Sequence, residues 1–352
     1  MNTAQAITLH DGYKAGHKDQ YPEKTELVYS NFTPRSSRVA GSDHIVVFGV
    51  QYFVKRYIIE QFNTTFFSQC KQKAVKKFKR RMKNYLGTDV CTRHNEALHD
   101  LKYMPVIIKS LPEGTVCPIT VPFMTLYNTK SEFFWVTNML ESIISTTIWM
   151  PITSATTAYR YRQLMDAFTE KTCDSSAHAD FQGHDFSMRG MAGLEAACMS
   201  SAGHALSFRG SDTMPVIDFL EDYYNADDET LTVCTVPATE HSVMCSGSKD
   251  EEIETFERLI NKIYPSGIVS IVSDTWDFWR VITEFLPKLK DDIMKREGTV
   301  VIRPDCYDSE TKVFTDSGWK YFKDLTKEDL VAQVLEDGTQ EFVKPTKYFK
   351  EE

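Results

Sequence analysis

Residues 268–274, Ile-Val-Ser-Ile-Val-Ser-Asp, and residues 299–305, Thr-Val-Val-Ile-Arg-Pro-Asp, decide the fold of this chain. Each is a short apolar run rich in β-branched residues that ends in a carboxylate, and a helical pattern over 275–296 separates the two. Further helices are predicted at 191–206, 214–225 and 249–263. Short β-branched runs that alternate with helices predict a parallel sheet or an α/β barrel.

Polar residues follow the predicted strands at the point where each strand ends. They are Asp185, Asp212, Glu240, His241, Asp274, Arg303 and Asp305. Catalysis in α/β barrels takes place at the carboxyl ends of the strands. Each residue taken alone also has a structural interpretation: Asp212 could cap a helix, an isolated His241 is more often structural, and Phe186 is equally a core residue or a stacking platform. Their recurrence at successive strand ends favours an active site.

The first 150 residues have a different pattern, in which strands and helices mix without regular alternation. Strands are predicted at 26–30, 45–48, 106–109 and 120–126, and helices near 50–63, 66–84 and 131–147. Another helix is predicted at 152–172. We therefore expect an α+β domain over residues 1–150 and part of an α/β barrel over residues 151–305, with residues 306–352 as a third segment.

Composition excludes several classes of protein. The net charge of −9 argues against nucleic-acid binding, which normally needs a basic face. The basic run at 71–83 fits a solvated helical face better than a polyanion site, because its apolar residues recur at helical spacing. A signal peptide and a membrane-spanning apolar run are both lacking. The eight cysteines form no CxxC pair, so we expect a cytoplasmic protein without disulfides or a metal site built from protein ligands.

At these motifs the sequence resembles the nicotinamide phosphoribosyltransferase family. The matching motifs, in chain order, are Asp11-Gly-Tyr-Lys-Ala-Gly-His17, Phe48-Gly-Val-Gln-Tyr52, Trp135-Val-Thr-Asn138, His184-Asp-Phe186, Arg189-Gly190, Gly210-Ser-Asp-Thr213, Val236-Pro-Ala-Thr-Glu-His241, Val272-Ser-Asp274 and Ile302-Arg-Pro-Asp305. The resemblance covers residues 1–305. It implies an α/β fold, in which an α+β N-terminal region precedes part of the irregular (β/α) barrel of type II phosphoribosyltransferases.

The resemblance also implies a reaction. Nicotinamide would be joined to C1 of 5-phosphoribosyl-1-pyrophosphate, giving nicotinamide mononucleotide and pyrophosphate. The pyridine ring would stack between Phe186 and Tyr13 of the partner subunit in a homodimer, and Arg303 and Asp212 would bind the carboxamide. Asp212 would disfavour nicotinic acid, because two carboxylates repel each other. Nicotinate phosphoribosyltransferase is the nearest enzymatic alternative.

The same resemblance assigns the phosphate and ribose contacts. Arg189 would lie near the phosphate of the product, and Arg35 would reach a phosphate from the partner subunit. Asp305 would hold the ribose hydroxyls, and Asp274 would lie close to the Mg²⁺-pyrophosphate or the ribose. Mg²⁺ is therefore an expected cofactor.

His241 has a separate expected role. In the family the equivalent histidine can be phosphorylated by ATP, so ATP is a second expected cofactor. We expect the neighbouring Glu240 to orient the imidazole.

The pattern changes at Cys306. Residues 306–352 resemble the N-terminal splicing region of an intein, in the starting Cys306, Thr311 to Thr315, Gly318 and Glu328 to Val331. A hairpin is predicted at 335–339. The resemblance implies an incomplete all-β, HINT-like segment, with Cys306 as the nucleophile that converts the preceding peptide bond into a thioester.

Several interpretations of residues 306–352 remain open. Cys306 could instead lie in an ordinary enzyme loop. We expect a chain that is inactive until it is joined to a C-terminal part of the enzyme and intein. A split-intein splicing partner and a truncated, non-functional fragment are the alternatives from other classes.

Overall fold

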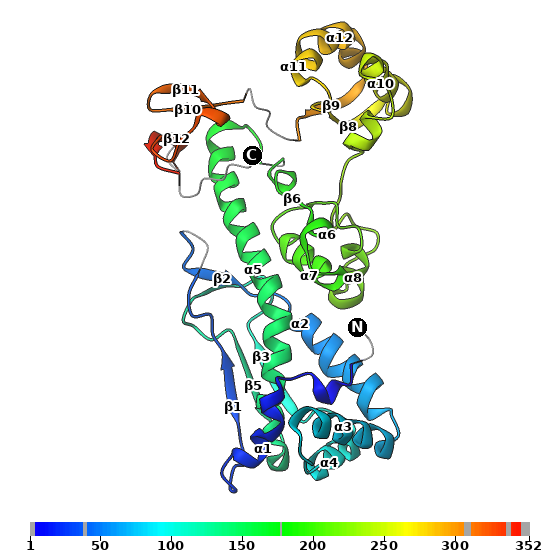
Figure 1. Cartoon of the computed structure of the whole chain (residues 1–352), viewed down its shortest axis with the longest axis vertical. Coiled ribbons are helices and arrows are strands. Elements are labelled where there is room, and N and C mark those ends of the chain that lie inside the picture. The colour runs from blue at the N-terminus through cyan, green and yellow to red at the C-terminus, as the bar shows by residue number, and fades with distance from the viewer. Residues whose placement is uncertain (1–3, 38–40, 177, 306–310, 336–338, 346–352) are drawn as a thin grey trace. The chain divides into compact units, whose positions relative to one another are not determined.

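A computed structural model describes residues 4–37, 41–176, 178–305, 311–335 and 339–345 of the chain (Figure 1). The chain forms two compact units, residues 1–234 and 235–352. The division falls between Cys234 and Thr235 along the chain. The boundaries after residues 150 and 305 stay predictions from the sequence. Within the described residues, no helix is long and apolar enough to cross a membrane.

The helices of the first unit are α1 (His17–Gln20), α2 (Val50–Phe53), α3 (Lys71–Leu86), α4 (Arg93–Leu101), α5 (Trp135–Thr172), α6 (Ser187–Gly190), α7 (Leu194–His204) and α8 (Val216–Tyr224). Its strands are β1 (Tyr29–Phe32), β2 (His44–Val46), β3 (Val106–Ser110), β4 (Val116–Pro118), β5 (Met124–Asn128), β6 (His184–Asp185) and β7 (Gly210–Ser211). The second unit contains α9 (His241–Met244), α10 (Glu252–Arg258), α11 (Phe278–Arg280), α12 (Leu286–Lys295), β8 (Ser266–Val272), β9 (Glu297–Arg303), β10 (Lys312–Thr315), β11 (Gly318–Tyr321), β12 (Val331–Val334) and β13 (Gln340–Val343).

The N-terminal region combines an antiparallel sheet with helices, as an α+β fold does. Its three strands follow the order β1-β5-β3, and β2 pairs with β4 in a second, two-stranded sheet. Buried side chains from the strands, from α5 and from the helical segments over 50–101 form one apolar core, which includes Phe53, Phe66, Leu126 and Ile144. Burial of such side chains is the main source of stability in a fold of this kind.

Helix α5 is a single helix of 38 residues, drawn in green in Figure 1. The prediction of two separate helices over 131–147 and 152–172 was wrong. The two form one continuous helix, and Pro151 lies inside it rather than at a break. Proline removes one backbone hydrogen bond, but the apolar face of α5 continues through the buried Ile148, Pro151 and Ile152. Packing of that face maintains the helix across the proline.

Each unit contains a short set of parallel strands. In the first unit β6 pairs with β7, and Gly210 of β7 forms a parallel bridge with Cys234. In the second unit β8 pairs with β9 over seven residues, and Ala238 forms a parallel bridge with Ser270 of β8. The parallel pairing predicted from the runs at 268–274 and 299–305 is therefore confirmed.

Strands β10 to β13 form a separate antiparallel sheet in the order β11-β10-β12-β13. Val331 of β12 pairs with Val343 of β13, which confirms the strand pairing on either side of the predicted turn. Residues 336–338 of that turn, and Cys306, lie outside the described residues. The chain thus changes from parallel to antiparallel pairing after β9.

Candidate active site

The end of β6 presents one aromatic ring to solvent. Asp185 ends the strand with its side chain buried, and the next side chain, Phe186, is 51% exposed. Because successive side chains of an extended segment point in opposite directions, burial of Asp185 directs Phe186 outward. An exposed ring on a buried strand end is a suitable platform for stacking a planar ligand.

The end of the neighbouring strand β7 presents a carboxylate beside that ring. Asp212 follows β7 directly, and its Oδ2 atom lies 3.4 Å from Nε2 of His184. The His184 ring also lies 5.1 Å from the Phe186 ring, measured between centroids. A Cβ atom on Gly210 would come within 2.7 Å of Nδ1 of His184, so glycine is required for this ring to lie against β7. His184 therefore contacts Phe186 and Asp212, two of the residues that were predicted to bind nicotinamide.

Asp185 is the centre of a buried hydrogen-bond network. Its carboxylate accepts from the hydroxyls of Ser187 and Thr213, both at 2.5 Å, and of Ser211 at 3.2 Å. Burial raises the pKa of Asp185, but these hydrogen bonds outweigh it and hold the pKa below its ordinary value. The group is therefore ionised at neutral pH.

In the second unit, three parallel segments bring polar residues together at their carboxyl ends. The backbone N–H of Thr239 donates to the carbonyl of Ser270 at 2.9 Å, which joins the first segment to β8. Val272 of β8 pairs with Arg303 of β9, so the three segments lie side by side. Beyond them, the three chain segments lead to His241, Asp274 and Asp305. His241 Nε2 lies 3.7 Å from Asp305 Oδ2 and 3.9 Å from Asp274 Oδ1.

Backbone and side-chain contacts fix this cluster. The backbone N–H of Asp305 donates to Asp274 Oδ2 at 2.9 Å. Arg303 donates from Nη2 to the carbonyl of Thr239 at 2.7 Å, and its Nε lies 3.7 Å from Asp305 Oδ1. The cluster therefore combines an imidazole, a guanidinium and two carboxylates on three strand ends.

The contacts of His241 include a residue other than Glu240, whose orienting role stays a prediction. Nδ1 of His241 lies 3.1 Å from the hydroxyl of Thr275, and the carboxylate of Glu240 accepts a hydrogen bond from Ser242. Glu240 is the extended residue before α9, so its side chain turns toward the first turn of that helix. Thr275, which sequence reasoning missed, is the residue that contacts the ring.

The segment that contains Tyr13 is fixed to α5. The buried Lys14 donates to Asn138 Oδ1 at 2.6 Å and forms an ion pair with Glu141. The backbone N–H of Asp11 donates to Ser142 at 3.1 Å. Tyr13 itself is 67% exposed, which is the exposure that a ring offered to a partner molecule requires.

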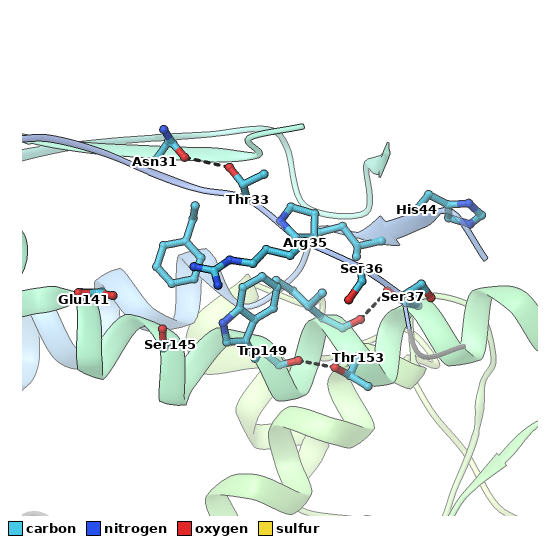
Figure 2. Close-up of a pocket in the computed structure, with 15 residues that line it drawn as sticks. Asn31, Thr33, Arg35, Ser36, Ser37, His44, Glu141, Ser145, Trp149 and Thr153 are labelled. Atoms are coloured by element: carbon cyan, nitrogen blue, oxygen red, sulfur yellow. Dashed lines mark hydrogen bonds between the residues drawn. The ribbon is translucent and has the colours of Figure 1, made fainter. Parts of the chain in front are cut away.

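Arg35 lines a cavity of about 770 Å³ that also borders α5. Figure 2 shows its side chain extending over Trp149, along the helix face that carries Glu141, Ser145 and Thr153. The walls contain several hydroxyl groups as well as this guanidinium, so the cavity can receive a polar, anionic group.

The structure therefore groups the predicted residues into separate sets. Phe186, Asp212 and the exposed Arg189 belong to the parallel strands of the first unit and the helix α6 that follows β6. His241, Asp274, Arg303 and Asp305 form one cluster in the second unit. Among the described residues, no group of three or more His, Cys, Asp or Glu side chains could hold a metal ion by itself.

Comparisons with known proteins assign the family. Residues 5–97 match "Nicotinamide phosphoribosyltransferase, N-terminal domain", and residues 181–339 match "Nicotinate phosphoribosyltransferase (NAPRTase) family". The second match runs past Cys306. No part of either match covers residues 98–180, which include all of α5.

Three proteins named nicotinamide phosphoribosyltransferase are similar to the chain. The one from Acinetobacter baylyi is 51% identical over 320 residues, covering 88% of this chain and 62% of that protein. Those from Mycoplasma genitalium and Xanthomonas campestris pv. campestris are each 30% identical; the matches cover 86% and 85% of this chain, and 67% and 61% of those proteins. The chain thus spans about two thirds of the length of these relatives.

A solved structure shows the same fold. The crystal structure of human nicotinic acid phosphoribosyltransferase superposes with a TM-score of 0.54 at 15% identity, covering 85% of this chain and 61% of that one. The fold is therefore a mixed α/β fold similar to that of type II phosphoribosyltransferases. Together with the identity to the M. genitalium and A. baylyi proteins, these findings show that the chain belongs to the nicotinamide phosphoribosyltransferase family.

Proposed function

We propose that the complete protein joins nicotinamide to C1 of 5-phosphoribosyl-1-pyrophosphate, with release of pyrophosphate. The observation that carries the proposal is the placement of an exposed ring, Phe186, and a carboxylate, Asp212, on paired strand ends, with His184 in contact with both. A pyridine-carboxamide needs an aromatic surface for its ring and an acceptor for its amide N–H. Both are present in this chain.

The reaction forms one bond and breaks another at C1 of the ribose. The ring nitrogen of nicotinamide bonds to C1 of the ribose, while the C1–O bond to pyrophosphate breaks and its electron pair leaves with the pyrophosphate. On this scheme Asp305 would hold the ribose hydroxyls and Arg303 would donate to the carboxamide oxygen. The role of the chain is to position the two substrates, which can supply much of the rate enhancement.

Mg²⁺ fits the acidic pair of the second unit. Protein sites for Mg²⁺ commonly use one or two carboxylates together with substrate phosphates, and Asp274 and Asp305 supply two carboxylates on adjacent strand ends. These two residues would hold the ion, which neutralises charge on the departing pyrophosphate.

Two residues of the first unit are proposed to act across a homodimer. Tyr13, on its segment fixed to α5, would stack on the pyridine ring bound by the partner subunit, and Arg35 would reach a phosphate there. Arg189 would bind phosphate within its own subunit. The support is the exposure of Tyr13 and the cavity beside Arg35.

His241 is proposed to accept the γ-phosphoryl group of ATP, forming an N–P bond and releasing ADP. Its side chain is 44% exposed. Thr275 contacts Nδ1, so Nε2, which lies beside the carboxylates of Asp274 and Asp305, is the nitrogen that would accept the phosphoryl group. An acid-labile phosphate on the protein after incubation with ATP and Mg²⁺ is the expected result, and the same label on His241→Asn protein would overturn this role.

The activity test uses the complete protein with 5-phosphoribosyl-1-pyrophosphate, Mg²⁺ and either nicotinamide or nicotinic acid. Nicotinamide mononucleotide should form at a much higher kcat/KM than nicotinic acid mononucleotide. A preference for nicotinic acid would instead favour nicotinate phosphoribosyltransferase. Absence of both products would overturn the proposed reaction.

Residues 306–352 are proposed to begin an intein that interrupts the enzyme after Asp305. The change from parallel β8–β9 to the antiparallel β10–β13 sheet supports a different origin for this segment. The family match over residues 181–339 runs across this junction, as it would in an enzyme that is not interrupted. The test is therefore whether the peptide bond between Asp305 and Cys306 is present in the mature protein.

A further inference from the structure

The buried side chains at the ends of β6 and β7 flank the two exposed residues of the nicotinamide site. Asp185 and Ser187 are buried on either side of Phe186, and Ser211 and Thr213 are buried on either side of Asp212. All four flanking residues belong to one hydrogen-bond network, and the Asp185 carboxylate is its only charged member.

We propose that Asp185 is a positioning residue for nicotinamide recognition, holding Phe186 and Asp212 at a fixed separation through Ser187, Ser211 and Thr213. The inference rests on the proposed function, because it concerns the same pyridine site. Asp185 is 8% exposed and points away from the side on which Phe186 is exposed, so it acts through its neighbours.

The contacts connect both strand ends to the same carboxylate. Oδ1 accepts from the Ser187 hydroxyl at 2.5 Å, which fixes the residue after Phe186. Oδ2 accepts from the Thr213 hydroxyl at 2.5 Å and the Ser211 hydroxyl at 3.2 Å, which fixes the residues on both sides of Asp212. The backbone adds a further link, because Asp212 N donates to Asp185 O at 2.9 Å.

Two serines of α7 anchor the network to the core. The Ser187 oxygen lies 3.0 Å from the Ser200 hydroxyl, and the Ser201 hydroxyl lies 3.0 Å from that of Ser211. Ser200 in turn contacts Ser154 of α5 at 3.3 Å. Charge-assisted hydrogen bonds are stronger than neutral ones, so the ionised carboxylate makes the arrangement more rigid than hydroxyls alone would.

The network explains why the recognition residues are held by buried polar groups rather than by apolar packing. An apolar core fixes volume but tolerates small shifts, whereas hydrogen bonds to one carboxylate fix direction and distance. Nicotinamide recognition requires hydrogen bonds of this kind, because Phe186 must stack on the planar ring while Asp212 accepts from its amide group. Positional errors of about 1 Å can cost about a hundredfold in rate.

Thr213 offers a matched pair of variants. Thr213→Val keeps the branched shape and removes the hydroxyl, and Thr213→Ser keeps the hydroxyl and removes a methyl group. In the complete protein, Thr213→Val should raise KM for nicotinamide about tenfold and lower the preference for nicotinamide over nicotinic acid about fivefold, if one charge-assisted hydrogen bond is lost. KM for 5-phosphoribosyl-1-pyrophosphate should stay within about twofold, and Thr213→Ser should retain nearly wild-type constants.

A second measurement does not depend on activity. Hydrogen exchange of the backbone amides at 186–190 and 211–213 should be faster in Thr213→Val than in Thr213→Ser protein, with exchange in α8 unchanged. Ser187→Ala should accelerate exchange at 186–190 in the same way. Asp222→Asn, on the exposed face of α8, is the control and should change neither measurement.

The two proposals fail in different ways. If the wild-type protein prefers nicotinic acid or uses neither pyridine, the proposed function is wrong, and the exchange rates still test the positioning role. If nicotinamide is used but Thr213→Val and Thr213→Ser give the same KM and the same exchange rates, Asp185 does not position the site. A loss of folded protein with KM unchanged would likewise show a purely structural role and overturn the inference.

Discussion

Nζ of Lys14 lies 2.6 Å from Oδ1 of Asn138, in the interior of the first unit. Lysine is rarely buried unless it is paired, and Lys14 also contacts the backbone carbonyl of Asn138 at 3.0 Å and the carboxylate of Glu141. The residue before it, Tyr13, is exposed. A buried cation thus fixes the segment that presents this ring.

Replacing Lys14 with Met should destabilise the first unit and displace Tyr13. The variant leaves the side-chain carbonyl of Asn138 without the Lys14 donor, so the free energy of unfolding should fall by about 1–3 kcal/mol. Because Glu141 is largely exposed, the ion pair should contribute little to that change. Urea denaturation of the variant measures the effect.

Lys24→Met is the control, since Lys24 is exposed and outside this network. A denaturation midpoint equal to that of wild type in both variants would show that the Lys14 contacts are not stabilising. In the complete protein, a higher KM for nicotinamide in Lys14→Met alone would connect the segment to the pyridine site.

Asp212→Asn should reduce the preference for nicotinamide over nicotinic acid about tenfold or more. The carboxylate accepts the amide N–H and repels the carboxylate of nicotinic acid, whereas Asn can donate to that carboxylate. Kinetics with both substrates at saturating 5-phosphoribosyl-1-pyrophosphate give the ratio of the two kcat/KM values. Asp222→Asn serves as the matched control, and an unchanged ratio in Asp212→Asn would show that Asp212 does not select the amide.

Glu252, the first residue of α10, should make the stability of the second unit depend on pH. It is 1% exposed, and neither carboxyl oxygen has a hydrogen-bond partner in the described part of the chain. Burial raises the pKa of Glu252 from 4.5 to about 7, although the charge of Arg280 opposes the shift. Between pH 4.5 and about 7, Glu252 is ionised in the unfolded state but still protonated in the folded state. The contribution of Glu252 to the free energy of unfolding is therefore greatest below pH 4.5, falls as the pH rises and stays reduced above about 7.

Glu252→Gln should therefore stabilise the chain at pH 8, by about 1–3 kcal/mol, and have little effect near pH 4.5. Thermal denaturation at both pH values tests this expectation. The exposed Glu257→Gln provides the comparison. An equal gain at both pH values would mean that ionisation of Glu252 is not the cause.

The sequence was most informative where a pattern depends on local chemistry. The β-branched runs at 268–274 and 299–305 predicted the parallel strands, and the residues after them predicted the cluster of His241, Asp274 and Asp305. Helix boundaries were less predictable: Pro151 suggested a break in α5 because the packing that maintains the helix across it comes from residues distant in sequence.

Partners of individual side chains could not be predicted in the same way. His184 meets Asp212 only because β6 and β7 pair in a register that places His184 beside Gly210. Thr275 meets His241 for a similar reason, across 34 residues of chain. Such contacts depend on strand register, which a single sequence does not specify. The motif Gly210-Ser-Asp-Thr213 contained one signal, since a glycine before three polar residues is consistent with a close backbone approach.

The junction between Asp305 and Cys306 gives the last prediction. If residues 306 onward begin an intein, a thiolate at Cys306 attacks the carbonyl of Asp305, and excision joins Asp305 to a later residue. While the junction is intact, the chain should give no turnover, because the insertion follows directly on the Asp305 that would bind ribose.

Trypsin cuts after Arg296 and rarely between Arg303 and Pro304, so one peptide beginning at Glu297 contains the junction. Mass spectrometry of protein from the native source should find a peptide that runs from Glu297 through Asp305 into a sequence other than Cys306. If only the peptide from Glu297 to Lys312 is found, residues 306–352 are a lasting part of the protein, and turnover by that intact chain would show that they do not interrupt the enzyme at all.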